Sequence, residues 1–230
     1  MAVVETTVLA GRAALAESLA DTFTAGIRLA VAQRGHAVLA LSGGRTPLAF
    51  FEALRTRPLP WDKVTVTLVD ERCVPHDHPR SNTAFVRTHL LQDHAAAATF
   101  LSPVTETGAP ILDLKLPARI DMAHFGMGTD GHTASWFPEG DALGAALADE
   151  GPALLALSAP GAPEPRLTFT WAALRTARSA VLHFEGSAKA AVFAEAVKPG
   201  PMAALPVRRL LHQDDVEVLV FTDIQPPETP

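Results

Sequence analysis

The chain has 230 residues, of which 48% are hydrophobic and 19% are charged, and its formal net charge at pH 7 is −6. This length and composition are ordinary for a globular protein with one large domain or two small ones. The acidic balance, without any run of lysine or arginine, argues against nucleic acid or an anionic membrane as the main partner. The single cysteine, Cys73, cannot form an internal disulfide, and the N-terminus shows no secretion signal. We therefore expect a cytoplasmic protein.

The hydrophobic pattern alternates along the chain between the period of a helix and that of a strand. Apolar side chains recur every three or four residues over 13–32, which predicts a helix. Further helices are expected over 46–54, 82–91 and 187–197, with Thr46 suited to the N-cap of the second helix and Pro47 to its first turn. Short apolar runs predict strands over 36–42, 64–69, 120–125, 153–158, 166–170, 179–184 and 216–221.

This alternation predicts an α/β fold in which a mostly parallel sheet is covered by helices on both faces. No internal repeat or long linker divides the sequence. A single domain over residues 1–230 is therefore expected, and residues 225–230, which include three prolines, are expected to form a disordered tail.

The most informative segment is a glycine-rich loop over residues 126–135, which reads Gly-Met-Gly-Thr-Asp-Gly-His-Thr-Ala-Ser. Glycines let backbone N–H groups approach a ligand closely, and His132 supplies an imidazole, a group that can both accept and donate a proton. The loop follows a predicted strand, and ligands of open α/β sheets bind at the carboxyl ends of strands. The glycine spacing also matches a dinucleotide-binding pattern, but Pro138 falls where that pattern requires a helix. We expect the chemistry of the protein in this loop.

A second glycine turn, Leu-Ser-Gly-Gly-Arg-Thr-Pro over residues 41–47, lies between a predicted strand and a predicted helix. Free N–H groups and the positive end of a helix dipole would face one point there, which suits a phosphate group. Spacing alone leaves open an ordinary tight turn. Residues 70–72, Asp-Glu-Arg, offer two carboxylates and a cation at a strand end, a pattern that is also common in solvated loops.

Five segments together resemble the 6-phosphogluconolactonases of the glucosamine-6-phosphate isomerase/6-phosphogluconolactonase family. They are residues 41–47, 70–75 with Ser81-Asn82, 126–138, 166–170 and 186–190, in the family's order. The resemblance implies a three-layer α/β sandwich of modified Rossmann type, as in glucosamine-6-phosphate deaminase and ribose-5-phosphate isomerase. The chain departs from the family's usual pattern at Arg45, at Trp136 and in the segment 103–121, which is shorter than is typical.

The activity that the resemblance implies is hydrolysis of 6-phospho-D-glucono-1,5-lactone to 6-phospho-D-gluconate, the second step of the oxidative pentose phosphate pathway. It needs no cofactor and no metal, and the expected partner is the small sugar phosphate lactone. His132 would deprotonate the attacking water and then protonate the departing ring oxygen. Whether the protein is a monomer or a homodimer stays open.

The resemblance also implies roles for residues around His132. Asp130 would position His132 or its loop, and Asp70 would orient a partner or bind a sugar hydroxyl. Arg72 and the glycine-rich backbone are both candidates for stabilising the oxyanion, so Arg72 has two possible roles. The residues expected to bind the substrate, mainly its phosphate, are Ser42, Gly43, Gly44, Arg45, Thr46, Arg72, Gly128, Arg166 and Lys189.

Two other functions remain as alternatives. An amino-sugar phosphate deaminase-isomerase has the same fold, but its histidine loop resembles Gly-His-Ile-Ala-Phe-Asn-Glu, whereas this chain reads Gly-His-Thr-Ala-Ser-Trp-Phe and carries Glu139 beyond Pro138. A non-catalytic sugar-phosphate sensor of a transcriptional regulator would carry a helix-turn-helix segment, for which we find no spare basic region.

Overall fold

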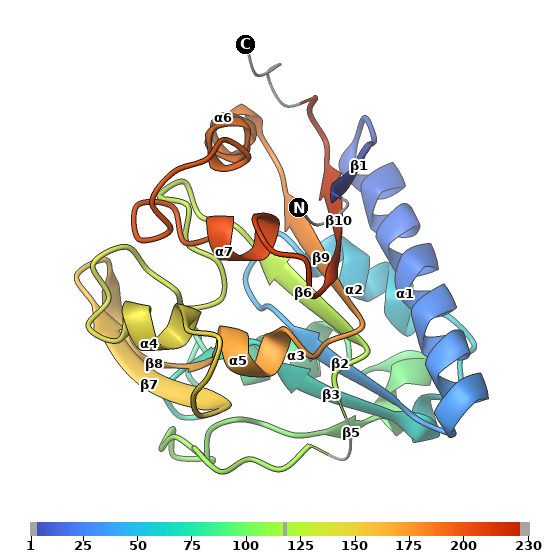
Figure 1. Cartoon of the computed structure of the whole chain (residues 1–230). Helices are drawn as coiled ribbons and strands as arrows, with labels where there is room; N and C mark the ends of the chain where they lie inside the picture. The colour runs from blue at the N-terminus through green and yellow to red at the C-terminus, as the bar shows by residue number, and fades with distance from the viewer. Residues whose placement is uncertain (1–3, 117–118, 226–230) are drawn as a thin grey trace.

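The computed structural model describes residues 4–116 and 119–225, which form an α/β sandwich of three layers (Figure 1). Seven parallel strands make the central sheet in the order β1-β10-β9-β6-β2-β3-β5. The predicted fold class is confirmed. Residues 226–230 of the expected disordered tail lie outside the described part of the chain. Within that part, no helix is both long enough and apolar enough to cross a membrane.

The strands and helices follow the predicted alternation. The strands are β1 (Val4–Val8), β2 (Ala37–Leu41), β3 (Val64–Leu68), β4 (Asp70–Arg72), β5 (Thr99–Phe100), β6 (Met122–Gly126), β7 (Leu154–Ala159), β8 (Ala162–Phe169), β9 (Ser179–Phe184) and β10 (Glu217–Thr222). The helices are α1 (Arg12–Arg34), α2 (Leu48–Arg55), α3 (Asn82–His89), α4 (Leu143–Leu147), α5 (Trp171–Leu174), α6 (Ser187–Ala196) and α7 (Arg208–Leu211), with 3₁₀ turns at Trp61–Lys63 and Asp93–Ala97.

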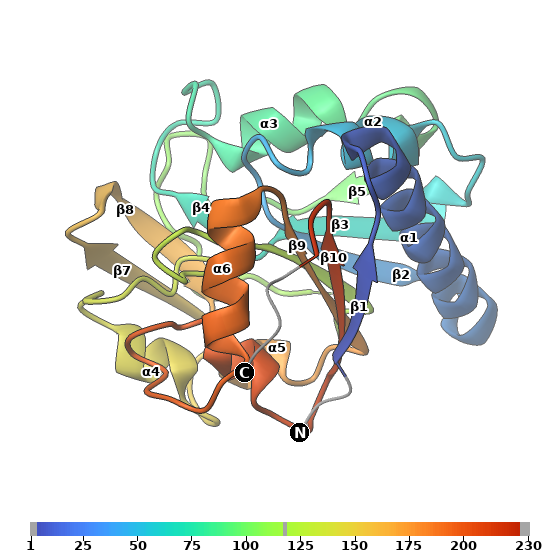
Figure 2. The same ribbon diagram turned by 90° about the horizontal axis from the view of Figure 1, so that it is seen from above.

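The sheet separates two hydrophobic cores. Strand β2 is buried along its whole length, and its side chains alternate between the two cores. Leu39 and Leu41 pack with side chains of α1, α2 and α3, whereas Val38 and Ala40 belong to the core that contains residues of α4 to α7. Figure 2 shows α1, α2 and α3 gathered on one side of the sheet and α4, α5 and α6 on the other. Burial on both faces explains why the central strands read as continuous apolar runs rather than as alternating patterns.

Three strands form a second, antiparallel sheet in the order β4-β8-β7. The strands predicted over 153–158 and 166–170 exist, but they pair with each other and with β4 rather than entering the parallel sheet. Strand β8 also begins at Ala162, four residues before the predicted start. Pro163 and Pro165 made this stretch resemble a loop, because proline cannot donate to a ladder. They lie toward the end of the hairpin where the β7–β8 register is irregular.

Several predicted boundaries need correction. Pro47 occupies the N-cap position of α2, and no side chain forms a capping hydrogen bond there. The prediction of Thr46 as N-cap is therefore wrong. Helix α3 ends at His89, two residues before the predicted end, because Leu90 already serves as its C-cap. Helix α1 is longer than predicted and ends at Arg34. Its C-cap is Gly35, whose left-handed backbone (φ 81°) lets its N–H donate to Val31 O.

Candidate active site

The site lies where the order of the parallel strands changes direction. Strands β2 and β6 are neighbours, yet the chain leaves β2 toward β3 on one side and reaches β6 on the other. The loops after these two strands therefore meet at the carboxyl edge of the sheet, which is the usual ligand site in open α/β folds. A cavity of about 330 Å³ opens there.

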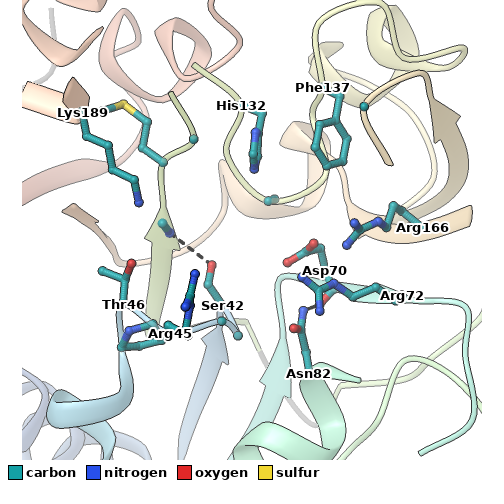
Figure 3. Close-up of a pocket in the computed structure, with 18 residues that line it drawn as sticks. Ser42, Arg45, Thr46, Asp70, Arg72, Asn82, His132, Phe137, Arg166 and Lys189 are labelled. Carbon is teal, nitrogen blue, oxygen red and sulfur yellow. Dashed lines mark hydrogen bonds between the residues drawn. The ribbon is translucent and has the colours of Figure 1, made fainter. Parts of the chain in front are cut away.

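The cavity brings together nearly all the residues that the sequence predicted for the site (Figure 3). Those that line it are Ser42, Gly43, Gly44, Arg45, Thr46, Asp70, Arg72, Gly128, His132, Arg166 and Lys189. Asp130 does not line the cavity but contacts His132. Residues distant in the sequence are thus joined by the fold, as a ligand pocket requires.

The turn after β2 has the properties of an anion site. Ser42 fastens it to β6, because its N–H and its hydroxyl donate to His124 O at 3.1 and 3.0 Å and its Oγ accepts from the Gly126 N–H at 3.3 Å. Among the described residues, none accepts a hydrogen bond from the backbone N–H groups of residues 43–46. Gly44 adopts a left-handed conformation (φ 91°), which glycine tolerates without strain. The turn therefore offers free donors to a ligand.

His132 is held in one orientation by Asp130. Its Nδ1 lies 2.6 Å from Asp130 Oδ1, so that its Nε2 is left for a ligand. Burial alone would raise the pKa of Asp130, but the hydrogen bonds and charge of His132 outweigh burial and lower it. The ring also packs against Gly128, where an added Cβ would come within 2.3 Å of Nδ1, and against Phe137, at 4.5 Å between ring centroids. Gly128 therefore gives the imidazole its space.

The small sheet anchors the histidine loop. Ser135 Oγ donates to Asp70 Oδ2 at 2.6 Å, and the Ser135 N–H donates to Thr168 Oγ1 at 3.3 Å. Trp136 Nε1 donates to Phe169 O at 2.9 Å. One oxygen of Asp70 is thus committed to the loop, and the other has no hydrogen-bond donor among the described residues. The position of His132 consequently depends on β4 and β8 as well as on β6.

Glu71 is a structural residue and not part of a solvated loop. It is 0% exposed, and it accepts from the N–H groups of Arg72, Asn82 and Thr83 at 2.6 to 2.8 Å and from Ser81 Oγ at 3.2 Å. Burial raises the pKa of Glu71, although these backbone hydrogen bonds oppose the rise. A carboxylate at this point satisfies the free N–H groups at the start of α3. The loop interpretation of residues 70–72 is therefore wrong.

Four cationic side chains line the cavity in two groups. Figure 3 shows Lys189 and Arg45 beside Thr46, and Arg72 and Arg166 beside Asp70. Burial lowers the pKa of Arg166, whereas Asp70 raises it, and burial lowers the pKa of Lys189. The Nε atoms of Arg72 and Arg166 are buried and lack a hydrogen-bond acceptor in the described structure. Such donors suit an anionic ligand.

Outside the two glycine segments, 41–47 and 126–135, the cavity wall contains three residues to which the sequence assigned no role, namely Asn82, Phe137 and Gly161. Asn82 and Phe137 stand within the segments that carry the family resemblance, but nothing in their spacing indicates that they meet a ligand. Gly161 lies in the turn between β7 and β8, which a Pro-Gly pair marks in the sequence. In the described part of the chain, no three His, Cys, Asp or Glu side chains are grouped so that they could hold a metal ion.

A chain of polar groups runs from the buried His124 to the exposed Arg12. His124 Nε2 lies 3.3 Å from His183 Nδ1, and His183 Nε2 lies 3.6 Å from Glu185 Oε1. Arg12 donates to Glu185 Oε2 at 2.8 and 3.0 Å. Burial lowers the pKa of His124 well below its usual range, and His183 lowers it further. The nearby imidazole of His183 lowers the pKa of Glu185 most. Together with the hydrogen bonds from Arg12, and against the effect of burial, it brings this pKa from 4.5 to about 2.

The low pKa of Glu185 predicts a pH-dependent contribution to stability. An acid whose pKa is lower in the folded state stabilises the fold above its unfolded value and loses this contribution as the pH falls through its folded value. Glu185→Gln should therefore lower the Tm at pH 7, and the difference from the unaltered chain should shrink between pH 4.5 and about 2. Thermal melts over this range test it, with Glu217→Gln on the exposed end of β10 as the control. A difference that does not change with pH would contradict the assignment.

Comparisons with known proteins agree with this geometry. Residues 10–220 match the family model described as glucosamine-6-phosphate isomerases/6-phosphogluconolactonase. A 6-phosphogluconolactonase of Rhizobium meliloti (strain 1021) is 48% identical over 209 residues, which cover 87% of this chain and 90% of that protein.

Solved structures agree as well. The crystal structure of a 6-phosphogluconolactonase from Shewanella baltica OS155 superposes with a TM-score of 0.89 at 33% identity, covering 96% of this chain and 97% of the other. A putative 6-phosphogluconolactonase from Neisseria gonorrhoeae FA 1090 superposes with a TM-score of 0.88 at 35% identity, covering 95% of this chain and 99% of the other. The chain therefore belongs to the glucosamine-6-phosphate isomerase/6-phosphogluconolactonase family, among its 6-phosphogluconolactonases.

Proposed function

We propose that this protein hydrolyses 6-phospho-D-glucono-1,5-lactone to 6-phospho-D-gluconate by water attack assisted by His132. The observation that carries the proposal is that an oriented imidazole and an anion-binding turn line one cavity. The identity to 6-phosphogluconolactonases across most of the chain supports the choice of substrate. The product would be the acid that the oxidative pentose phosphate pathway consumes.

The phosphate of the substrate would lie on the turn after β2. The free N–H groups of residues 43–46 belong to this turn, and Lys189 approaches it from α6. Arg166 would approach from the opposite side of the cavity. Charge-assisted hydrogen bonds of this kind are strong in a site that is sheltered from water.

The proton transfers would take place at Nε2 of His132. With Nδ1 bound to Asp130, Nε2 takes a proton from the attacking water and returns it to the ring oxygen as the C–O bond of the ester breaks. Asp130 would hold the imidazole and stabilise its cationic form. The N–H of Gly128 already donates to His132 O at 2.9 Å, which favours Arg72 as the donor to the tetrahedral oxyanion. Asp70, through its free oxygen, would bind a hydroxyl of the sugar.

The activity can be tested with three parallel reactions. The protein is supplied with the lactone, with glucosamine 6-phosphate, or with buffer alone, and release of protons and of ammonia is followed. We expect proton release from the lactone above the rate of its spontaneous opening, and no ammonia. Ammonia release from glucosamine 6-phosphate would instead favour the deaminase-isomerase alternative. Glu139 argues against that alternative, because it is exposed beyond Pro138 and does not line the cavity.

Lys189→Ala should mainly weaken substrate binding. A hydrogen bond to a charged group contributes about 1.5–3 kcal/mol, so we expect KM to rise about 10- to 100-fold with a smaller change in kcat. Steady-state kinetics with the lactone measure both constants. Lys198→Ala is a matched control, since Lys198 lies just beyond the same helix and pairs with Glu195 outside the cavity. An unchanged KM in the Lys189 variant would remove Lys189 from the phosphate site.

A further inference from the structure

The side chain of Asn82 is fixed within the wall of the cavity. It lies at the first residue of α3 and is only 4% exposed. Its Nδ2 donates to Asp70 O at 3.0 Å, and its backbone N–H donates to Glu71 Oε1 at 2.8 Å. Since the amide nitrogen is committed to the protein, the orientation of the carboxamide is set and the amide oxygen is the free end.

The amide oxygen of Asn82 is aimed at the turn after β2. A Cβ added at Gly43 would lie 2.2 Å from Asn82 Oδ1, so the oxygen occupies the space that a side chain at position 43 would need. Both residues line the cavity (Figure 3). No described residue donates a hydrogen bond to this oxygen. An acceptor held rigidly in a cavity wall without a donor is suited to a ligand.

Hydrogen-bond acceptors are scarce in this cavity, whereas donors are abundant. Arginine and lysine side chains and the free N–H groups of residues 43–46 supply donors for the phosphate. The 6-phosphogluconolactone ring carries three free hydroxyls, and each loses a hydrogen bond to water if it is buried without an acceptor. Besides His132, the side-chain acceptors that remain free among the described residues lining the cavity are the second oxygen of Asp70, the Thr46 hydroxyl and Asn82 Oδ1.

We propose that Asn82 is a specificity-determining residue whose Oδ1 accepts a hydrogen bond from one ring hydroxyl of the sugar phosphate. The proposal rests on the proposed lactonase function and adds to it a reason for preferring a hydroxylated ring. Before the substrate arrives, Asp70 O holds the carboxamide of Asn82 and Glu71 holds its backbone N–H. The bond therefore forms without the loss of side-chain freedom that a surface amide would suffer.

The test combines a substitution with changes in the substrate. Asn82→Ala and the unaltered protein are assayed with the 6-phosphogluconolactone and with its 2-deoxy, 3-deoxy and 4-deoxy forms, each corrected for spontaneous opening. For the natural lactone, kcat/KM should fall about 10-fold in the variant, as expected for one buried hydrogen bond. For one of the deoxy lactones, the unaltered protein should show a similar loss and the variant no further loss.

The same measurements distinguish this result from a purely structural role of Asn82 and from failure of the proposed function. An equal fall of kcat/KM on all four lactones would mean that Asn82 only supports the structure, and an unchanged kcat/KM would also overturn the proposal. Ser81→Ala removes the cap that accepts from the Ala84 N–H, and so controls for damage to the start of α3. If thermal melting shows that the alanine variant is unfolded, Asn82→Ser replaces it, because the serine side chain is too short for its hydroxyl to reach the ligand. If the unaltered protein does not hydrolyse the natural lactone, the proposed function itself fails.

Discussion

His132→Ala is expected to lower kcat for the lactone by about 10²- to 10⁴-fold, the range that a general acid–base group contributes. The reason is that Nε2 would serve both proton transfers, while the hydrogen bond of Nδ1 to Asp130 keeps it aimed. Binding of 6-phosphogluconate should be largely retained, because the donors of the turn after β2 and Lys189 are unchanged. Initial rates corrected for spontaneous opening give kcat, and calorimetric titration with 6-phosphogluconate gives Kd.

The control for this prediction is His94→Ala. His94 is exposed in the 3₁₀ turn Asp93–Ala97 and does not line the cavity, so its removal should leave both constants unchanged. If the His132 variant kept the kcat of the unaltered chain, His132 would have no part in proton transfer. If it lost affinity for 6-phosphogluconate as strongly as activity, its role would be in binding.

Glu71→Gln should lower the free energy of unfolding by about 2–4 kcal/mol, since a glutamine cannot accept from all the N–H groups that the carboxylate now satisfies. Three backbone N–H groups and the Ser81 hydroxyl converge on the two oxygens of Glu71. The amide nitrogen of the glutamine would itself be a donor, so the N–H groups that face it would lose their acceptor. Burial raises the pKa of Glu71, which means that keeping its charge inside the protein is costly. Removing this charge offsets part of the loss.

Thermal and urea unfolding measure this effect, and a fall in Tm of roughly 5–12 °C is expected for a chain of this size. Glu106→Gln is the control, because the Glu106 side chain is exposed in a loop. A Glu71 variant as stable as the control would show that the N–H groups at the start of α3 find other acceptors. Since Glu71 also fixes Asn82, a moderate rise in KM should accompany the loss of stability.

The central layer of the fold could be predicted because burial on both faces leaves a continuous apolar run in the sequence. Strands β2, β6, β9 and β10 follow largely apolar runs, whereas β3 alternates valine with threonine. Strand β1 was not predicted, because polar residues interrupt it and Glu5 and Thr6 are exposed at the edge of the sheet. The predicted start of β8 lay four residues too far along the chain, because Pro163 and Pro165 made its first residues resemble a loop. The pairing of β4 with β8 depends on contacts between residues about 95 positions apart, which no local pattern records.

The candidate site could be predicted where local sequence determines local geometry. The glycine turns on either side of the β2–β6 junction and the neighbouring Asp130 and His132 are of this kind. Lys189 and Arg166 were predicted from the family resemblance alone. Asn82 and the structural role of Glu71 could not be predicted, because both depend on how α3 packs against β4. Only the folded chain shows that an asparagine beside a helix cap also faces a ligand cavity.

The hairpin of β7 and β8 has a consequence for the way in which relatives of this protein could diverge. It supplies one side of the cavity, including Gly161 and Arg166, from a single continuous stretch of chain that lies outside the seven-stranded sheet. Exchanging this hairpin for one of another length or composition would reshape the substrate chamber while the main scaffold stays intact. New sugar phosphates could thus be accommodated by changes near the turn of the hairpin, as long as Thr168 and Phe169, which hold the loop of His132, are kept.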